Sequence, residues 1–219
     1  MGAEMGKVAR AGIHFGLRAP SVRLLVLGSF VTAGFFFWGW YAWPPYFLEL
    51  LGRDLVWVAG LIAALFSLAM ILGNALVGRV VRPGRRRTTI LIASSAVLTA
   101  AMVGVGALRL FWVAVPLFLL GAVAAGLAGP VRQTYLHAII PSEERATLVS
   151  FDALMGSLGS VGGQAGLGYL AKLRSIADGF VVGGLATAVV VPLYAALRHR
   201  HEHADVVVGE ADVVAPLTG

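Results

Sequence analysis

The sequence predicts an all-α integral membrane protein, and three observations support this fold class. Hydrophobic residues make up 58% of the 219 residues and charged residues only 13%, whereas roughly a quarter of an ordinary soluble protein is charged. The charged residues are clustered between long uncharged runs. Six of these runs are close to the length of about 20 apolar residues that a helix needs to cross a bilayer. We therefore expect six transmembrane helices, with the lipid bilayer as their surroundings.

The six predicted spans follow one another with short connections. Pro20 and Ser21 precede the first span, and Pro141 and Ser142 precede the fifth, as is common where a helix begins. Backbone amides cannot stay unpaired in lipid, so each span is expected to be a helix. The expected spans cover residues 24–48, 55–78, 88–108, 110–131, 146–171 and 179–197.

The distribution of Lys and Arg predicts how the chain is oriented. Most of the 17 basic residues lie in the terminal segments and in the connections on one side of the predicted spans. The positive-inside rule makes this side cytoplasmic. We therefore expect a basic cytoplasmic segment (1–20), a six-helix transmembrane domain (21–198) and a flexible cytoplasmic tail (199–219), in the plasma membrane.

The same composition excludes several classes of function. The net charge is +6, but the basic residues lie between the apolar runs, where they set the topology of the spans. We therefore expect no nucleic-acid partner. The absence of cysteine excludes thiolate metal sites and cysteine catalysis. His199, His201 and His203 alternate in the tail, but a solvated tail is favoured over a metal site there. We expect no metal and no cofactor.

A short internal repeat connects the second and fifth spans. Residues 73–78 and 163–168 both follow the pattern glycine, carboxamide, alanine, two variable residues, glycine. Each hexapeptide lies in the middle helix of a three-helix block, and the two blocks enter the membrane from opposite sides. This pattern favours two inverted three-helix repeats, as in many transporters, with chance similarity in a glycine-rich chain as the alternative.

Three segments resemble the C-terminal half, helices seven to twelve, of a major facilitator superfamily transporter. Residues 78–87 resemble the family's Gly-x-x-x-Asp-Arg-x-Gly-Arg-Arg cytoplasmic loop, and residues 141–147 resemble its Pro-x-Glu-x-Arg-Ala connection. The glycine-rich run 156–168 resembles helix eleven. On these motifs the cytoplasmic gating-loop candidates are Gly78, Gly84, Arg85, Arg86 and Arg145.

The resemblance implies half of a major facilitator fold, and the sequence departs from the family in two ways. The loop lacks its acidic residue, because Arg82 or a one-residue deletion stands at that position. The family's substrate path lies between two six-helix halves, and only one is present. We therefore expect the chain to be the product of a split gene, a fragment, or a half that self-associates. We expect a second six-helix half as its partner, either a separate chain or a second copy.

Asp152 is the only acidic residue inside a predicted span. A charge at membrane depth is costly, so the carboxylate should face water or a partner. It shares one helical face with Gly156, Gly159, Gly163 and Gly166. One interpretation makes Asp152 a proton-coupling residue, and the other places it near the cytoplasmic interface among basic residues. The glycine face itself is expected to serve close helix packing.

Two groups of residues are candidates for lining a substrate cavity. The carboxamides can hydrogen-bond a solute, although each alone commonly bonds another helix. The deep aromatic residues of the first span would suit apolar or cationic aromatic solutes, while Trp43, Tyr46 and Phe47 are expected to form an interfacial belt. The cavity candidates are Trp38, Trp40, Tyr41, Asn74, Gln133 and Gln164.

These patterns favour a secondary active transporter, or half of one, that moves a small solute by alternating access. The most specific version of this hypothesis is proton-coupled efflux of lipophilic compounds. The alternative is a six-span scaffold or accessory subunit with no transport of its own. We do not expect an enzyme, because no nucleophile is paired with a base at depth, and His137 lies at a span's end without an obvious partner.

Overall fold

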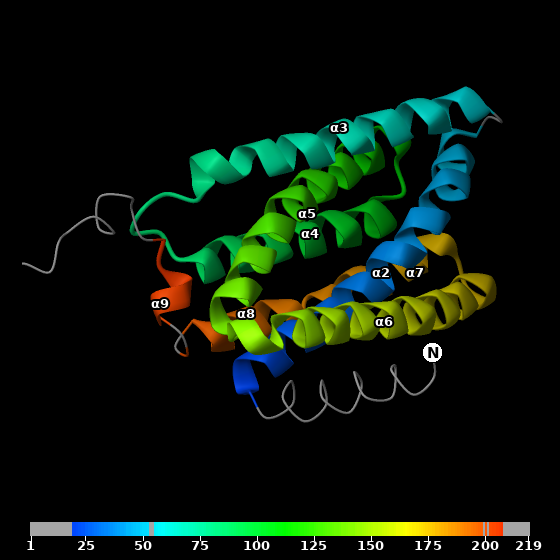
Figure 1. The fold of residues 1–219 in the computed structure, drawn as a ribbon. Coiled ribbons are helices and arrows are strands. Elements are labelled where there is room, and N and C mark those ends of the chain that lie inside the picture. The colour runs from blue at the N-terminus through cyan, green and yellow to red at the C-terminus, as the bar shows by residue number, and fades with distance from the viewer. Residues whose placement is uncertain (1–18, 53–54, 199, 201, 208–219) are drawn as a thin grey trace, which may run out of the picture.

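The computed structural model describes residues 19–52, 55–198, 200 and 202–207, and this part of the chain forms a bundle of helices (Figure 1). The helix α2 and its successors run back and forth along the bundle, and a single 3₁₀ turn precedes α6. The elements are α2 (Pro20–Leu51), α3 (Val56–Val80), α4 (Arg87–Leu108), α5 (Phe111–Ile139), the 3₁₀ turn η1 (Ser142–Glu144), α6 (Arg145–Leu173), α7 (Ile176–Thr187), α8 (Val190–Leu197) and α9 (Glu202–Asp205).

Five helical segments of the described chain are long and apolar enough to cross a membrane, and they correspond to five of the six predicted spans. The segment α7–α8 counts as one span, Ile176–Leu197. The remaining prediction, 146–171, forms most of α6, which has 29 residues but is rich in glycine and serine. That α6 also crosses the bilayer stays a prediction.

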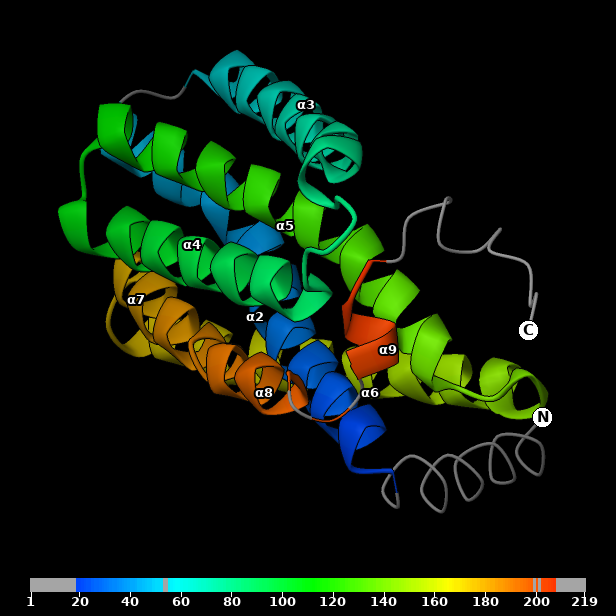
Figure 2. The ribbon, with the colours of Figure 1, turned by 90° about the vertical axis from the view of Figure 1, so that its left-hand side faces the viewer.

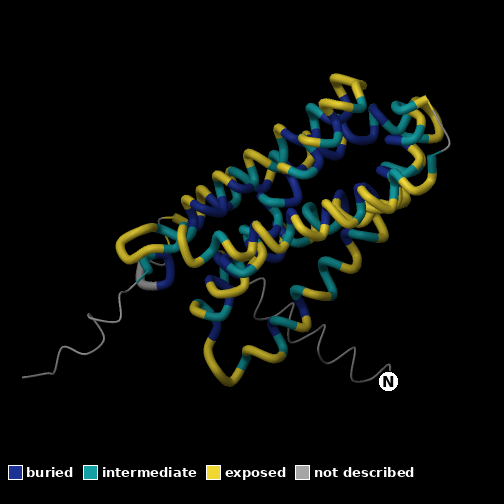
Figure 3. The backbone as a smooth tube through the Cα atoms, turned by 90° about the horizontal axis from the view of Figure 1, so that it is seen from above, coloured by how far each residue is buried: buried dark blue, intermediate teal, exposed yellow. Residues whose placement is uncertain are grey.

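The outside of the bundle is largely apolar, as a lipid-facing surface requires. Exposed residues lie along the outward faces of the helices (Figure 3), and many of them are large and hydrophobic. Trp57 at the start of α3 and Trp112 at the start of α5 are 67% and 81% exposed. These two residues, which the sequence pattern did not single out, have the exposure that an interfacial belt needs.

The predicted aromatic belt in α2 is wrong for Trp43, Tyr46 and Phe47. All three are buried in the bundle, and the Tyr46 hydroxyl donates a hydrogen bond to the backbone oxygen of Val105 at 2.9 Å. The Trp43 ring lies 5.7 Å from that of Phe118 in α5. Hydropathy gives the depth of a residue along a helix but not the face on which it lies, and this face of α2 is turned inward.

Helices α2 and α6 approach until their backbones touch, and glycine makes this possible. A Cβ at Gly163 would lie 2.2 Å from the Gly34 oxygen, and a Cβ at Gly159 would lie 2.0 Å from the Phe30 oxygen. Distances this short exclude any side chain at either position. The expectation that the Gly159–Gly163 face serves helix packing is confirmed.

Helices α3 and α5 form a second close crossing of the same kind. A Cβ at Gly73 would lie 2.2 Å from the Val123 oxygen, and a Cβ at Gly126 would lie 2.3 Å from the Met70 oxygen. Helix α4 packs between α5 and the α7–α8 segment, as Figure 2 shows. Helix α4 meets α7 at a third close contact, where a Cβ at Gly106 would lie 2.3 Å from the Ala177 oxygen. In α2–α6 and in α3–α5 two glycines each come this close to the backbone of the partner helix, and we call these two the backbone-contact pairs.

The segment predicted as a flexible tail differs from that prediction where the structure describes it. Residues 204–207 are buried or partly buried, and α9 lies beside the ends of α4 and α5 (Figure 2). Asp205 is fully buried against the first turn of α4, where backbone N–H groups need an outside acceptor. His199, His201 and most of the predicted N-terminal segment lie outside the described residues.

The glycine contact between α2 and α6 makes a direct prediction. Gly163→Ala should lower the free energy of unfolding by about 1–3 kcal/mol, because a methyl group cannot fit against the Gly34 backbone. Gly166→Ala is the matched control in the same helix, since nothing lies within 4 Å of its Cβ position. Thermal unfolding of the purified protein in detergent measures both. Equal effects of the two substitutions would contradict this packing.

Candidate functional site

An ion pair between Arg132 and Asp152 joins α5 to α6 inside the bundle. The Arg132 guanidinium donates to Asp152 through two nitrogens, Nη2 to Oδ1 at 2.7 Å and Nη1 to Oδ2 at 3.1 Å. The two side chains are only 17% and 14% exposed. This two-point arrangement is the geometry in which an arginine and a carboxylate bind each other most strongly.

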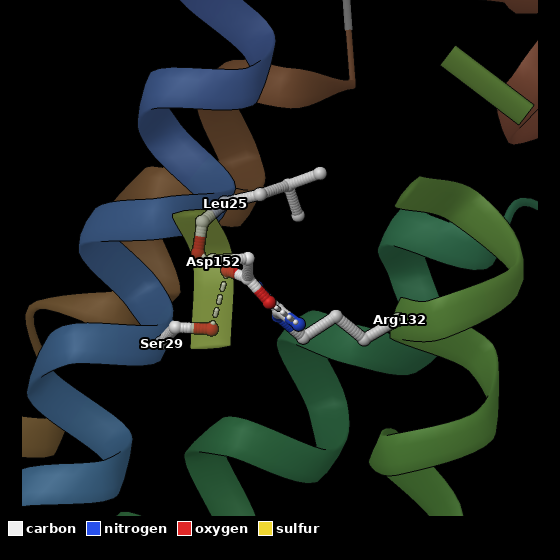
Figure 4. Close-up of polar contacts among 4 residues, drawn as sticks. All are labelled: Leu25, Ser29, Arg132 and Asp152. Carbon is white, nitrogen blue, oxygen red and sulfur yellow. Dashed lines mark hydrogen bonds and ion pairs between the residues drawn. The ribbon is translucent and has the colours of Figure 1, made fainter. Parts of the chain in front are cut away.

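Helix α2 completes this site from the other side (Figure 4). The Ser29 hydroxyl donates to Asp152 Oδ1 at 2.8 Å, and Arg132 Nη2 also donates to the Leu25 backbone oxygen at 3.0 Å. Tyr194 of α8 lies close enough to interact with the guanidinium. One ion pair therefore connects three helices and faces a fourth.

The position of the ion pair bears on both interpretations of Asp152, the interfacial one and the proton-coupling one. Asp152 lies seven residues into α6, which is about 10 Å from the start of that helix. It is paired with a basic residue, as the interfacial interpretation expected. The pair is also mostly removed from solvent, so the cost of carrying a charge there is high and a proton on Asp152 would weaken the pair.

Arg132 is the functional candidate that the sequence pattern missed. The predicted fourth span ended at residue 131, so Arg132 was placed in a connection, but α5 continues to Ile139. Span ends were set by hydropathy, whereas a helix continues for as long as its backbone hydrogen bonds do. The signal that could have found Arg132 is Asp152 itself, since a carboxylate within a span requires a partner inside the bundle.

A partly open cavity of about 260 Å³ adjoins the ion pair. Its wall comes from α2, α4, α5, α7 and α8. Arg132 is the one charged residue of this wall, and Asp152 neutralises it. The other polar residues of the wall carry hydroxyl groups and are Ser29, Thr32, Ser94, Ser95, Thr187 and Tyr194.

A second and much smaller cavity of about 50 Å³ lies next to the first, in the aromatic part of the bundle. The walls of the two cavities share Thr32 and Phe36 of α2, Leu98 of α4 and Ala125 of α5. The wall of the second cavity is almost entirely apolar and includes Trp40, Phe66, Phe118 and Phe180. The bundle thus contains two adjoining cavities, one lined by hydroxyl groups and one by aromatic rings.

The six predicted cavity residues do not meet in one place. Trp40 lines the aromatic cavity, and Trp38, Tyr41 and Gln164 line a more open depression of about 330 Å³. Trp38 is only 5% exposed and packs against Phe180, with ring centres 5.2 Å apart. The carboxamides Asn74 and Gln133 are exposed on α3 and α5 and line none of these cavities.

The gating-loop candidates are divided between two places at one end of the bundle. Gly84, Arg85 and Arg86 lie in the loop between α3 and α4, where Gly84 adopts a φ of 78° that favours glycine. Gly78 lies in the last turns of α3, with open space at its Cβ position. Arg145 begins α6 and is exposed. We call the end of the bundle that carries these residues the basic end.

An apolar bundle with five helical segments that are long enough to cross a membrane is the architecture of a multi-pass membrane protein. A family model of the Major Facilitator Superfamily matches residues 25–216, so the chain belongs to this superfamily, as the sequence motifs predicted. Members of this family are transporters rather than enzymes. A search of curated proteins found no match to this chain.

The buried ion pair should contribute to stability far more than an exposed one. Arg132→Ala should lower the free energy of unfolding by about 3–5 kcal/mol, because it leaves the Asp152 carboxylate buried without its counter-charge. Arg109→Ala is the control: Arg109 pairs with Asp178 at 3.2 Å but is 58% exposed, so its loss should cost less than about 1 kcal/mol. Thermal unfolding in detergent checks both, and equal losses would contradict the assignment.

Proposed function

We propose that this chain is one six-helix half of a secondary active transporter that moves a small lipophilic solute across the plasma membrane by alternating access. The observation that carries the proposal is the pair of adjoining cavities, one lined by hydroxyl groups and one by aromatic rings. Most solute-binding sites are apolar clefts with a few placed polar groups. The wall carries no net charge once Asp152 neutralises Arg132, which suits an uncharged or weakly polar solute.

Two inverted three-helix repeats would explain the two backbone-contact pairs. The repeat relates α2 to α5 and α3 to α6, so it converts the α2–α6 pair into the α5–α3 pair. Gly73 and Gly163, the first residues of the matching hexapeptides, each press against the backbone of the partner helix. Gly73 and Gly163 occupy matching positions of the two hexapeptides and make the same kind of helix contact, which supports a repeat over chance similarity. Inverted repeats are common in transporters of this kind.

Polar residues on the outside of the bundle support a second half. Ser67 and Asn74 are exposed on α3, seven residues apart, and Ser157 and Gln164 are exposed on α6 with the same spacing. Polar groups facing lipid are unfavourable, whereas small and polar residues are common where membrane helices meet. We propose that a second six-helix unit, as a separate chain or a second copy, covers these two stripes.

Within this proposal, Asp152 is the coupling residue and the basic end is cytoplasmic. Protonation of Asp152 would remove the charge that holds Arg132 and would free the guanidinium beside the cavity. The basic end carries the arginine-rich loop, and cytoplasmic connections of membrane proteins are enriched in Lys and Arg. A scaffold or accessory subunit without transport is the second candidate, but a scaffold needs neither a cavity nor an ion pair beside it.

The proposal of a second six-helix half leads to a prediction about the mass of the assembly. The protein purified in mild detergent should carry two six-helix units, observed by light scattering as two copies of this chain or as one copy with another six-span chain. Asn74→Leu together with Gln164→Leu should disturb the assembly, whereas Leu72→Ala, an exposed apolar change on α3, should not. A stable solution of single chains would contradict this part of the proposal.

Proton coupling predicts a specific loss in transport. Cells or proteoliposomes that contain the assembly should expel an uncharged lipophilic aromatic probe such as N-phenyl-1-naphthylamine, and faster when a proton gradient is imposed. Asp152→Asn keeps the hydrogen-bonding shape but cannot titrate, so its flux should no longer respond to the gradient. Trp57→Ala, an exposed change far from the cavity, is the control. An unchanged pH response in Asp152→Asn would remove Asp152 from the coupling mechanism.

A further inference from the structure

The last residues that the structure describes, 204–207, are attached by several contacts to the loop between α3 and α4. Gly84 N donates to the Val207 oxygen at 3.0 Å, and Val207 N donates to the Arg85 oxygen at 3.2 Å. Arg86 and Val206 form an antiparallel bridge between these contacts. The segment 204–207 therefore lies along the loop as a short second strand would, although the two regions are about 120 residues apart in sequence.

The centre of this attachment is the carboxylate of Asp205. Its Oδ1 accepts a hydrogen bond from the Thr88 backbone N–H at 2.8 Å, and its Oδ2 accepts from the Thr88 hydroxyl at 2.9 Å. Thr88 and Asp205 are both fully buried. The Thr88 N–H belongs to the first turn of α4, where the helix itself has no acceptor for it, and an anion there also interacts favourably with the helix dipole.

Further contacts join the same segment to other elements. The Arg87 guanidinium at the start of α4 donates to the Ala204 backbone oxygen. Separately from this segment, the Arg86 guanidinium of the loop donates to the oxygen of Arg198 at the end of α8. Ala204 is buried in the apolar cluster that contains Tyr135 of α5. The loop itself, residues 81–86, has no acidic residue, so the carboxylate at the start of α4 comes from this distant segment.

We propose that residues 204–207 are a latch that holds the loop between α3 and α4 against the basic end, and that this loop moves only when the latch opens. The contacts attach to the loop and to the first turn of α4 but not to the glycine crossings, so the latch opens without unpacking the bundle. Its opening exposes Asp205 and releases the Arg87 guanidinium from the Ala204 oxygen. This inference is independent of the transport function.

Hydrogen exchange of the full chain in detergent tests the latch directly. In Asp205→Ala, the Thr88 and Gly84 amides should exchange at least about tenfold faster, because a hydrogen bond to a carboxylate and the strand-like contact are lost together. Exchange around Gly73 and Gly126 should not change. Glu143→Ala is the control, since Glu143 is an exposed carboxylate that bonds only its neighbour Ser142. Unchanged exchange at Thr88 in Asp205→Ala would overturn the proposal.

The unaltered chain provides a second test that does not depend on any variant folding. If the latch opens as one unit, the amides of Gly84, Thr88 and Val207 share one opening event and should show the same protection, within a factor of about three. Thr88→Val, which keeps the backbone N–H and removes one of the two bonds to Asp205, should lower all three protections together. Protections that differ by more than tenfold in the unaltered chain would show separate contacts and would overturn the latch.

Discussion

Backbone contact at the two glycine crossings is the constraint on which the rest of the bundle depends. In lipid, helices gain nothing by hiding apolar surface from water, so they associate through close packing and hydrogen bonds. Gly159 and Gly163 hold α6 against α2, and Gly73 and Gly126 hold α3 against α5. The cavities lie beside these pairs, with walls that include both α2 and α5. Their size and position follow from how closely the pairs can approach.

The ion pair adds the polar connection that these crossings lack. Arg132 belongs to the α3–α5 pair, whereas Asp152, Ser29 and Leu25 belong to the α2–α6 pair. The bond therefore spans the boundary between the two packed units rather than strengthening either one. Because it is nearly removed from water, it is strong when both partners are charged and costly when either partner loses its charge. Loss of either side chain would thus weaken the contact between the two units.

Sequence patterns predicted the fold well and the site only in part, and the reason is physical. Hydropathy over about 20 residues marks a membrane span without any knowledge of packing, and glycine spacing marks a close helix contact. Neither property tells which face of a helix is turned inward, so Trp43 was placed in a belt although it is core. Asp152 stood out as a lone charge, but its partner Arg132 lay just beyond a hydropathy boundary. The contact of Asp205 with Thr88 joins segments 117 residues apart, which no local pattern reports.

Helix α6 carries glycine on more than the side that meets α2. Gly162, Gly166 and Gly168 have nothing within 4 Å of their Cβ positions, whereas Gly159 and Gly163 lie against the α2 backbone. Interlocked side chains resist movement because sliding past them requires each to change its rotamer, and a bare backbone lacks this resistance. Both glycine crossings share this property, so α2 and α6, like α3 and α5, are suited to shift along their axes by small steps, a shear motion.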